Sequence, residues 1–221
     1  MRRGPIHLTL CGVAAACALA FLAGAKAAAA DPDAWRAYQQ ADYASAARLY
    51  AQDARKGDRL AQFNYAMMLF RGEATETAPG EAFNWLRRAA EAGMMQAQYN
   101  LGLLYESGKS VPKSLNQATL WFERAAEQGH IEAQVDAGTQ YFLGRGAPKD
   151  YAKAAYWYRR AANAGHVGAQ YILASMYEKG DGVTQDLRLA MYWYAQAADQ
   201  GDVVAQAKGR ALARQYRDRE R

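Results

Sequence analysis

Apolar residues recur along most of this chain at three- and four-residue spacing, the period of an amphipathic helix. Between residues 96 and 107, for example, Leu101, Leu104 and Tyr105 fall on one helical face. Glycines interrupt this pattern at regular intervals, where their tolerance of a left-handed backbone suits them to end a helix. The composition agrees, because Ala, Leu, Gln, Glu and Arg favour helices whereas Val and Ile are sparse. The pattern predicts an all-α protein.

The same pattern repeats with a period of 36 residues. Five series keep this period in one register: two of single glycines, one of Ala-Gln pairs, one of tryptophans and one of paired alanines. Early members are Gly57 and Gly93, Gly72 and Gly108, Ala61-Gln62 and Ala97-Gln98, Trp85 and Trp121, and Ala89-Ala90 and Ala125-Ala126. A unit of this size cannot bury its apolar face alone, so neighbouring units must stack, and the period predicts an α-solenoid.

Each unit is predicted to contain a helix, a glycine loop and a second helix. Ser114, Asp150 and Asp186 share one repeat position just before the second helix, and all three are good N-cap residues. The first full unit lacks such a residue there, so Thr77 with Pro79 is expected to begin its second helix.

The period divides the chain into a series of segments. They are a signal peptide (1–30), an incomplete N-terminal repeat (31–56), four full repeats (57–92, 93–128, 129–164 and 165–200) and a C-terminal capping helix (201–221). The last segment ends in a wholly charged tail, and polar ends of this kind keep a solenoid from stacking on another copy. The mature chain is thus predicted to be one continuous domain of about eleven helices.

The third full unit, GHIEAQVDAGTQYFLGRGAPKDYAKAAYWYRRAANAG (Gly129–Gly165), resembles the Sel-one-like repeat family almost in full. This family is related to the tetratricopeptide repeats, and the resemblance covers residues 57–206 closely and 33–56 loosely. It implies a right-handed superhelix of helix-turn-helix repeats, whose first helices line a concave groove for proteins or peptides. One secreted branch of the family has a disulfide in each repeat and is associated with β-lactam binding. The mature chain lacks those cysteines, so that activity is not expected here.

The first 30 residues have the features of a secretory signal. Arg2 and Arg3 precede an apolar stretch over residues 6–22, and small residues with two possible signal-peptidase sites follow at 25–30. An uncleaved membrane anchor is the alternative, but the apolar stretch is short for a membrane span. We therefore expect a mature chain that begins near Asp31, resides in the periplasm or is secreted, and has no stable membrane insertion.

Cysteine content and charge exclude several functions. Both Cys11 and Cys17 lie inside the signal segment, so disulfides and thiol chemistry are not expected in the mature protein. Ala14 stands where a lipoprotein signal usually has leucine, so lipidation of Cys17 is not expected. Subtracting the three basic residues of the segment from the total of 27 leaves 24 against 22 acidic ones, a charge of +2. Nucleic-acid binding usually needs a concentrated basic face, so it is not expected.

The tryptophans and the two histidines of the mature chain are the most visible candidate sites. The tryptophans could form an aromatic ladder for a sugar or peptide, but they hold the packing positions of the repeat, which favours a role in the core. His130 and His166 share a repeat position after a glycine, so stacking could bring them close together. A metal site would need further ligands, and an exposed turn is the expected setting of both histidines.

No catalytic constellation is visible in the sequence. The mature chain has no Cys, no Ser-His-acid set at a nucleophile turn and no phosphate-binding glycine loop. The glycines recur as helix ends, and this periodicity explains them. The protein is predicted not to be an enzyme and to need no cofactor or metal ion.

The first helix of each unit is expected to carry the binding surface. In the related repeats its exposed face presents side chains to a bound segment, and the matching positions here are Asn64, Met67, Asn100, Leu103, Asp136, Thr139, Ile172 and Ser175. Asparagine can both donate to and accept from a peptide backbone, and Met67 and Leu103 offer adaptable apolar contact. The alternative for Asn64 and Asn100 is that they only complete the repeat consensus.

The sequence therefore favours a non-catalytic protein–protein interaction scaffold or regulator in the bacterial envelope, which binds a partner protein or peptide in the concave groove. One alternative is a secreted factor that binds a host protein. This alternative shares the binding mechanism and differs only in location. An envelope hydrolase is the alternative from another functional class.

Overall fold

The computed structural model describes residues 31–78 and 80–219, so the predicted signal segment (1–30) lies outside the described residues. Within those ranges the chain forms helices and connecting turns, without a strand. The helices are α2 (Pro32–Gln39), α3 (Tyr43–Arg55), α4 (Arg59–Arg71), α5 (Glu81–Glu91), α6 (Met95–Ser107), α7 (Leu115–Glu127), α8 (Ile131–Leu143), α9 (Tyr151–Asn163), α10 (Val167–Lys179), α11 (Leu187–Asp199) and α12 (Val203–Arg219). None of these helices is long and apolar enough to cross a lipid bilayer.

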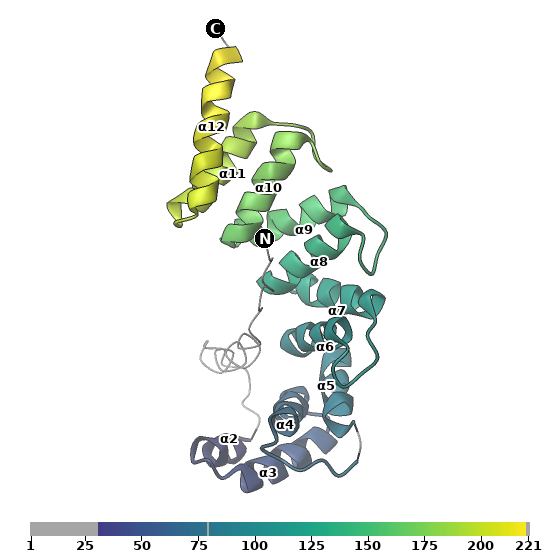
Figure 1. The fold of residues 1–221 in the computed structure, drawn as a ribbon. Helices are drawn as coiled ribbons and strands as arrows, with labels where there is room; N and C mark the ends of the chain where they lie inside the picture. Colours follow the sequence, from purple (N-terminus) through teal and green to yellow (C-terminus); the bar gives the residue numbers. More distant parts are fainter. Residues whose placement is uncertain (1–30, 79, 220–221) are drawn as a thin grey trace, which may run out of the picture.

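Consecutive helices pack against each other to form an α-solenoid. The contacts join mainly sequence neighbours, from α2 with α3 to α11 with α12. Figure 1 shows the resulting arc, in which α4 lies toward the inner side and α5 toward the outer side. The described chain begins with a helix pair, α2 and α3, and ends in the single helix α12. The all-α solenoid prediction is confirmed.

Three of the second helices begin at the predicted cap residues. The side chains of Ser114, Asp150 and Asp186 accept hydrogen bonds from backbone N–H groups in the first turns of α7, α9 and α11. Each cap satisfies a donor that the start of a helix otherwise leaves unpaired. The repeat position therefore fixes where these helices start.

The start of α5 corrects one prediction. The sequence placed Thr77 with Pro79 at the start of this helix, but α5 begins at Glu81, after Gly80. The Thr77 backbone N–H and hydroxyl both donate to one Glu81 carboxylate oxygen (2.7 and 2.8 Å), so the residue expected to start the helix lies in the loop. As a result α5 has 11 residues where α7, α9 and α11 have 13.

Most members of two repeating series are buried, and they hold the units together. The glutamines of the Ala-Gln pairs donate from Nε2 to a backbone carbonyl at the end of the preceding helix. The pairs are Gln62 with Ala54, Gln98 with Ala90, Gln134 with Ala126, and Gln170 with Ala162, at 3.1–3.2 Å. Trp85, Trp121 and Trp157 are buried, as predicted for core residues, whereas Trp193 is half-buried.

Close packing also requires small residues on the first helices. Gly102 of α6 faces Phe122 of α7, and a β-carbon added at Gly102 would lie 2.6 Å from that ring. Gly138 of α8 faces Tyr158 of α9 in the same way, at 3.2 Å. The equivalent position on α12, the last described helix, holds Arg210, whose side chain is exposed. Arg210 therefore places a large charged group where α6 and α8 have a small packing residue.

Candidate functional site

The predicted contact residues lie on the first helices α4, α6, α8 and α10. We call the helix faces that carry them the first-helix surface: Asn64, Met67, Asn100, Leu103, Asp136, Thr139, Ile172 and Ser175. Asn64 is buried and the other seven are half-buried. The eight residues thus occupy two repeat positions in four successive units, although their neighbours differ.

The two asparagines are bonded within the protein. Asn64 is 6% exposed, and its side chain is hydrogen-bonded to the Tyr50 hydroxyl. The Asn100 amide oxygen accepts from the Gln96 amide (3.1 Å), and its nitrogen donates to the Met67 sulfur (3.6 Å). These contacts join α3 to α4 and α4 to α6. They support the structural role that the sequence left open for both asparagines.

The hydroxyl residues of the surface contact tyrosines of the second helices. Thr139 Oγ1 lies 2.9 Å from the Tyr158 hydroxyl, and Ser175 is hydrogen-bonded to Tyr194. These bonds fix the hydroxyl side chains in place. The two remaining apolar positions pack at the edge of the core: Leu103 and Ile172.

Asp136 is the charged member of the first-helix surface. Its carboxylate accepts a hydrogen bond from the Tyr99 hydroxyl, so the pair bridges α8 and α6. Burial, together with repulsion from Glu106, raises the pKa of Asp136 to about 6, while the Tyr99 hydrogen bond opposes this rise. Burial also raises the pKa of Tyr99, so the phenol stays protonated as the donor. At neutral pH Asp136 is ionised, although its surroundings favour the protonated form.

Two further carboxylates, Glu106 and Glu132, act on Asp136. Both help to raise its pKa by charge repulsion, and we call the three carboxylates the acidic strip. Glu106 Oε1 also accepts a hydrogen bond from Nε2 of the buried Gln140 (2.8 Å). Among the described residues, no Lys or Arg forms an ion pair with any member of the strip. The strip therefore lacks a Lys or Arg countercharge in the described part of the chain.

His130 does not lie in an exposed turn, which corrects the prediction. Its ring is 9% exposed and stacks on Tyr99, with 4.2 Å between the ring centroids. Nδ1 accepts the backbone N–H of Ala133 (3.2 Å), so the proton resides on Nε2, which donates to Gln96 Oε1 (3.3 Å). Burial lowers the pKa of His130, and nearby Glu132 opposes this effect. His130 is a neutral cap that supports Tyr99.

His166 caps α10 in the same way as His130 caps α8. Its Nδ1 accepts the backbone N–H of Ala169 (3.1 Å), and its side chain is half-buried. In the part of the chain that the structure describes, no three His, Cys, Asp or Glu side chains gather as metal ligands would. The shared repeat position of the histidines is explained by helix capping.

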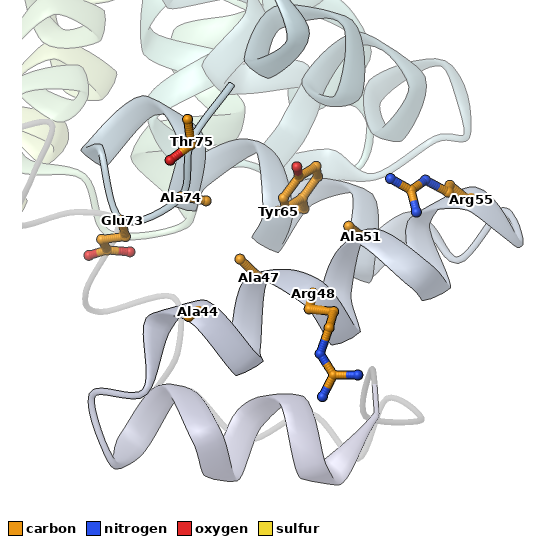
Figure 2. Close-up of a pocket in the computed structure, with 9 residues that line it drawn as sticks. All are labelled: Ala44, Ala47, Arg48, Ala51, Arg55, Tyr65, Glu73, Ala74 and Thr75. Atoms are coloured by element: carbon orange, nitrogen blue, oxygen red, sulfur yellow. The ribbon is translucent and has the colours of Figure 1, made fainter. Parts of the chain in front are cut away.

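A separate pocket of about 370 Å³ lies between α3 and the loop that follows α4. Figure 2 shows Ala44, Ala47 and Ala51 along α3, with Arg48 pointing away from the loop. Tyr65, Arg55, Glu73, Ala74 and Thr75 complete the lining. Ala74 stands where the third unit has Gly146, which packs tightly against α7. Alanine methyl groups line the α3 side of the pocket, and its charged lining residues are Arg48, Arg55 and Glu73.

The sequence did not reveal four residues around Asp136: Tyr99, Glu106, Glu132 and Gln140. One signal was available, because α6 and α8 are the only described helices without Lys or Arg. The hydrogen bonds themselves join neighbouring units. Spacing along the chain does not reveal which side chains meet across that boundary.

Four segments of the chain match the model of the Sel1 repeat: residues 59–94, 96–130, 131–166 and 167–202. Together they include the helices from α4 to α11, except for Met95 at the start of α6, and more than half of the chain. The chain belongs to the Sel1 repeat family. Sel1 repeat proteins are generally protein-interaction scaffolds and are typically not catalytic.

Two solved structures are similar to this Sel1 repeat chain. A Sel1 repeat protein from Oxalobacter formigenes has 33% sequence identity and a TM-score of 0.71, with 79% of this chain and 72% of that chain covered. A protective antigen present in uropathogenic Escherichia coli strains, which displays an SLR fold, has 38% identity and a TM-score of 0.64 over 72% of this chain. This chain spans only 34% of the antigen's length. Among curated proteins, none matches the chain.

Proposed function

We propose that this Sel1 repeat protein is a non-catalytic interaction scaffold or regulator of the bacterial envelope, and that its partner binds along the first-helix surface. The observation that carries the proposal is the contrast between packing and surface positions. The Ala-Gln pairs and tryptophans recur unchanged, whereas one half-buried position of the first-helix surface holds Met67, Leu103, Thr139 and Ser175 in turn. A uniform frame with a varied surface suits recognition of one particular partner along several units.

The side chains of this surface are already ordered before a partner arrives. Thr139 is held by Tyr158 (2.9 Å), Asp136 by Tyr99, and Asn100 by Gln96 (3.1 Å). Side chains that are fixed in advance lose little conformational freedom on binding, so more of the contact energy contributes to affinity. Figure 1 places α4, which begins this surface, on the inner side of the arc, where a bound segment can contact several units at once.

Site-specific photo-crosslinking in the cells that produce the protein tests this location. Leu103→p-benzoylphenylalanine and Thr139→p-benzoylphenylalanine are each expected to give a crosslinked product with the partner after irradiation. The same replacement at Tyr156, which is 51% exposed on α9 in the second-helix layer, is the matched control and is expected to give none. Circular dichroism verifies that each variant remains helical. A product from position 156 alone would place the partner on the opposite layer and overturn the proposal.

We also propose export, on the basis of the signal-like features of residues 1–30. Mass spectrometry of the protein purified from its own cells is expected to find an N-terminus between Ala28 and Asp31. Cleavage would leave the helical repeats free of the apolar segment. An intact Met1, or a lipid on Cys17, would contradict this proposal.

A further inference from the structure

The acidic strip stands apart in the charge distribution of the solenoid. Glu106 lies on α6, and Glu132 and Asp136 lie on α8. These two helices contain no Lys or Arg, whereas every other described helix contains at least one. The histidine beside the strip, His130, is a neutral cap and supplies no positive charge. Three carboxylates therefore share one part of the first-helix surface, although the chain after residue 30 carries a formal charge of +2.

A buried amide beside the strip has an unused acceptor. Gln140 is 2% exposed, and its Nε2 donates to Glu106 Oε1 (2.8 Å), so the amide points into the strip. The Gln140 Oε1 atom has no hydrogen-bond partner among the described residues. A buried acceptor without a donor costs free energy, which a donor supplied by a ligand would recover. The carboxylates call for a cationic hydrogen-bond donor, and the amide oxygen calls for a hydrogen-bond donor of any charge.

We propose that the acidic strip binds a Lys- or Arg-rich segment of the partner protein. This inference rests on the proposed function and names the chemistry of the partner. Ammonium and guanidinium groups carry positive charge and only donate hydrogen bonds, so they match carboxylates and an unused amide oxygen. Leu103 lies one helical turn before Glu106 on the same face, where it can contact the aliphatic stem of a Lys or Arg side chain.

Fluorescence anisotropy with synthetic peptides tests this chemistry on the mature protein. The probes are fluorescein-labelled peptides of about twelve residues in which alanine alternates with lysine, glutamine or glutamate. The lysine peptide is expected to bind at least tenfold more tightly than the glutamine peptide, and the glutamate peptide is expected not to bind. The affinity for the lysine peptide is expected to fall as salt is added, because salt screens the attraction.

Paired variants locate the binding site. The double change Glu106→Gln with Asp136→Asn is expected to weaken lysine-peptide binding at least tenfold. The control removes two exposed carboxylates elsewhere, Glu127→Gln on α7 with Asp199→Asn on α11, and is expected to leave affinity within twofold. Both pairs change the net charge equally, so a difference between them reports on the strip itself. Equal weakening by both pairs, or no binding of the lysine peptide by the unaltered protein, would overturn the inference.

The outcomes separate this inference from the proposed function. Crosslinking from positions 103 and 139 combined with no lysine-peptide binding would keep the first-helix surface as the binding site and reject its cationic ligand. A second copy of the chain is a competing source of cations, because α12 carries exposed Lys208, Arg210, Arg214 and Arg217. Sedimentation velocity that shows self-association, abolished by the strip variant, would assign the strip to self-assembly and reject a separate partner.

Discussion

Replacing Trp121 with alanine is expected to lower the free energy of unfolding by about 3–5 kcal/mol, the range for deleting a large buried aromatic side chain. The indole of Trp121 lies on α7 and is 6% exposed. It belongs to the core that includes residues of α3–α6, so it fills space between successive units. The guanidinium of Arg124 covers the ring at 4.4 Å. Removing the indole would leave a cavity that the neighbouring helices cannot close without moving.

Chemical denaturation followed by circular dichroism measures this loss. The control is Leu120→Ala, one residue away on α7, because the Leu120 side chain is 40% exposed and its removal is expected to cost less than about 1 kcal/mol. An unchanged unfolding midpoint for Trp121→Ala would mean that the ring is not part of the core. That result would restore the aromatic ladder as a candidate binding feature.

The second large effect concerns pH. Asp136→Asn is expected to increase the free energy of unfolding at pH 8 by about 2–3 kcal/mol and to leave it unchanged near pH 3.5. The raised pKa of Asp136, about 6, means that the folded protein disfavours the ionised carboxylate. Asparagine has nearly the same shape and can still accept the Tyr99 hydrogen bond, but it does not ionise.

The direction of this pH dependence follows from the two states. Asp136 titrates near pH 4 in the unfolded chain and near pH 6 in the folded protein. Below about pH 4 both states bind the proton, so the carboxyl group does not lower the free energy of unfolding. As the pH rises from 4 to 6 the unfolded chain releases its proton first, so the stability of the unaltered protein falls relative to the variant. Above about pH 6 the stability difference between the unaltered protein and the variant reaches its full size.

The groups around Asp136 define the controls for this measurement. The carboxyl group interacts with Tyr99 and Glu106 of α6, Glu132 of α8 and Tyr158 of α9. The capping residue His130 lies beside its partner Tyr99. Asp199→Asn on the exposed side of α11 is the comparison, for which no such gain is expected. A gain of the same size at both pH values would indicate improved packing rather than removal of a charge. Stabilisation together with weaker peptide binding would indicate that Asp136 serves recognition at a cost in stability.

Much of the fold follows from the 36-residue period, because caps and glycines repeat with the helices that they delimit. The sequence placed the first helix of the second full unit near residues 96–107, and α6 is Met95–Ser107. It placed the last helix near 202–218, and α12 is Val203–Arg219. The prediction failed at α5 because its cap residue, Gly80, has no side chain, so Glu76 Oε1 accepts the Ala82 N–H (3.1 Å) and Glu81 binds the preceding loop.

The candidate site was less accessible to sequence reasoning. Repeat positions identify which residues share the first-helix surface. They do not identify the side chains that contact and bury each of these residues. Asn64 is buried because Tyr50, on the preceding helix, bonds to its side chain. The environment of Asp136 depends on Tyr99 and Glu106 of the neighbouring unit, and contacts between units depend on the superhelical geometry. Burial and charge coupling therefore emerge only in three dimensions.

Arg210 determines how this architecture can change in length. The internal units have a small residue at this position, Ala66, Gly102, Gly138 or Ala174, and Gly102 leaves room for the ring of Phe122. The long charged side chain of Arg210 leaves no comparable space for an aromatic ring at this position of α12. Duplication of a unit such as residues 165–200, inserted ahead of α12, would preserve every type of contact and keep Arg210 last. Gene duplication can thus lengthen the first-helix surface from within, one row of side chains at a time.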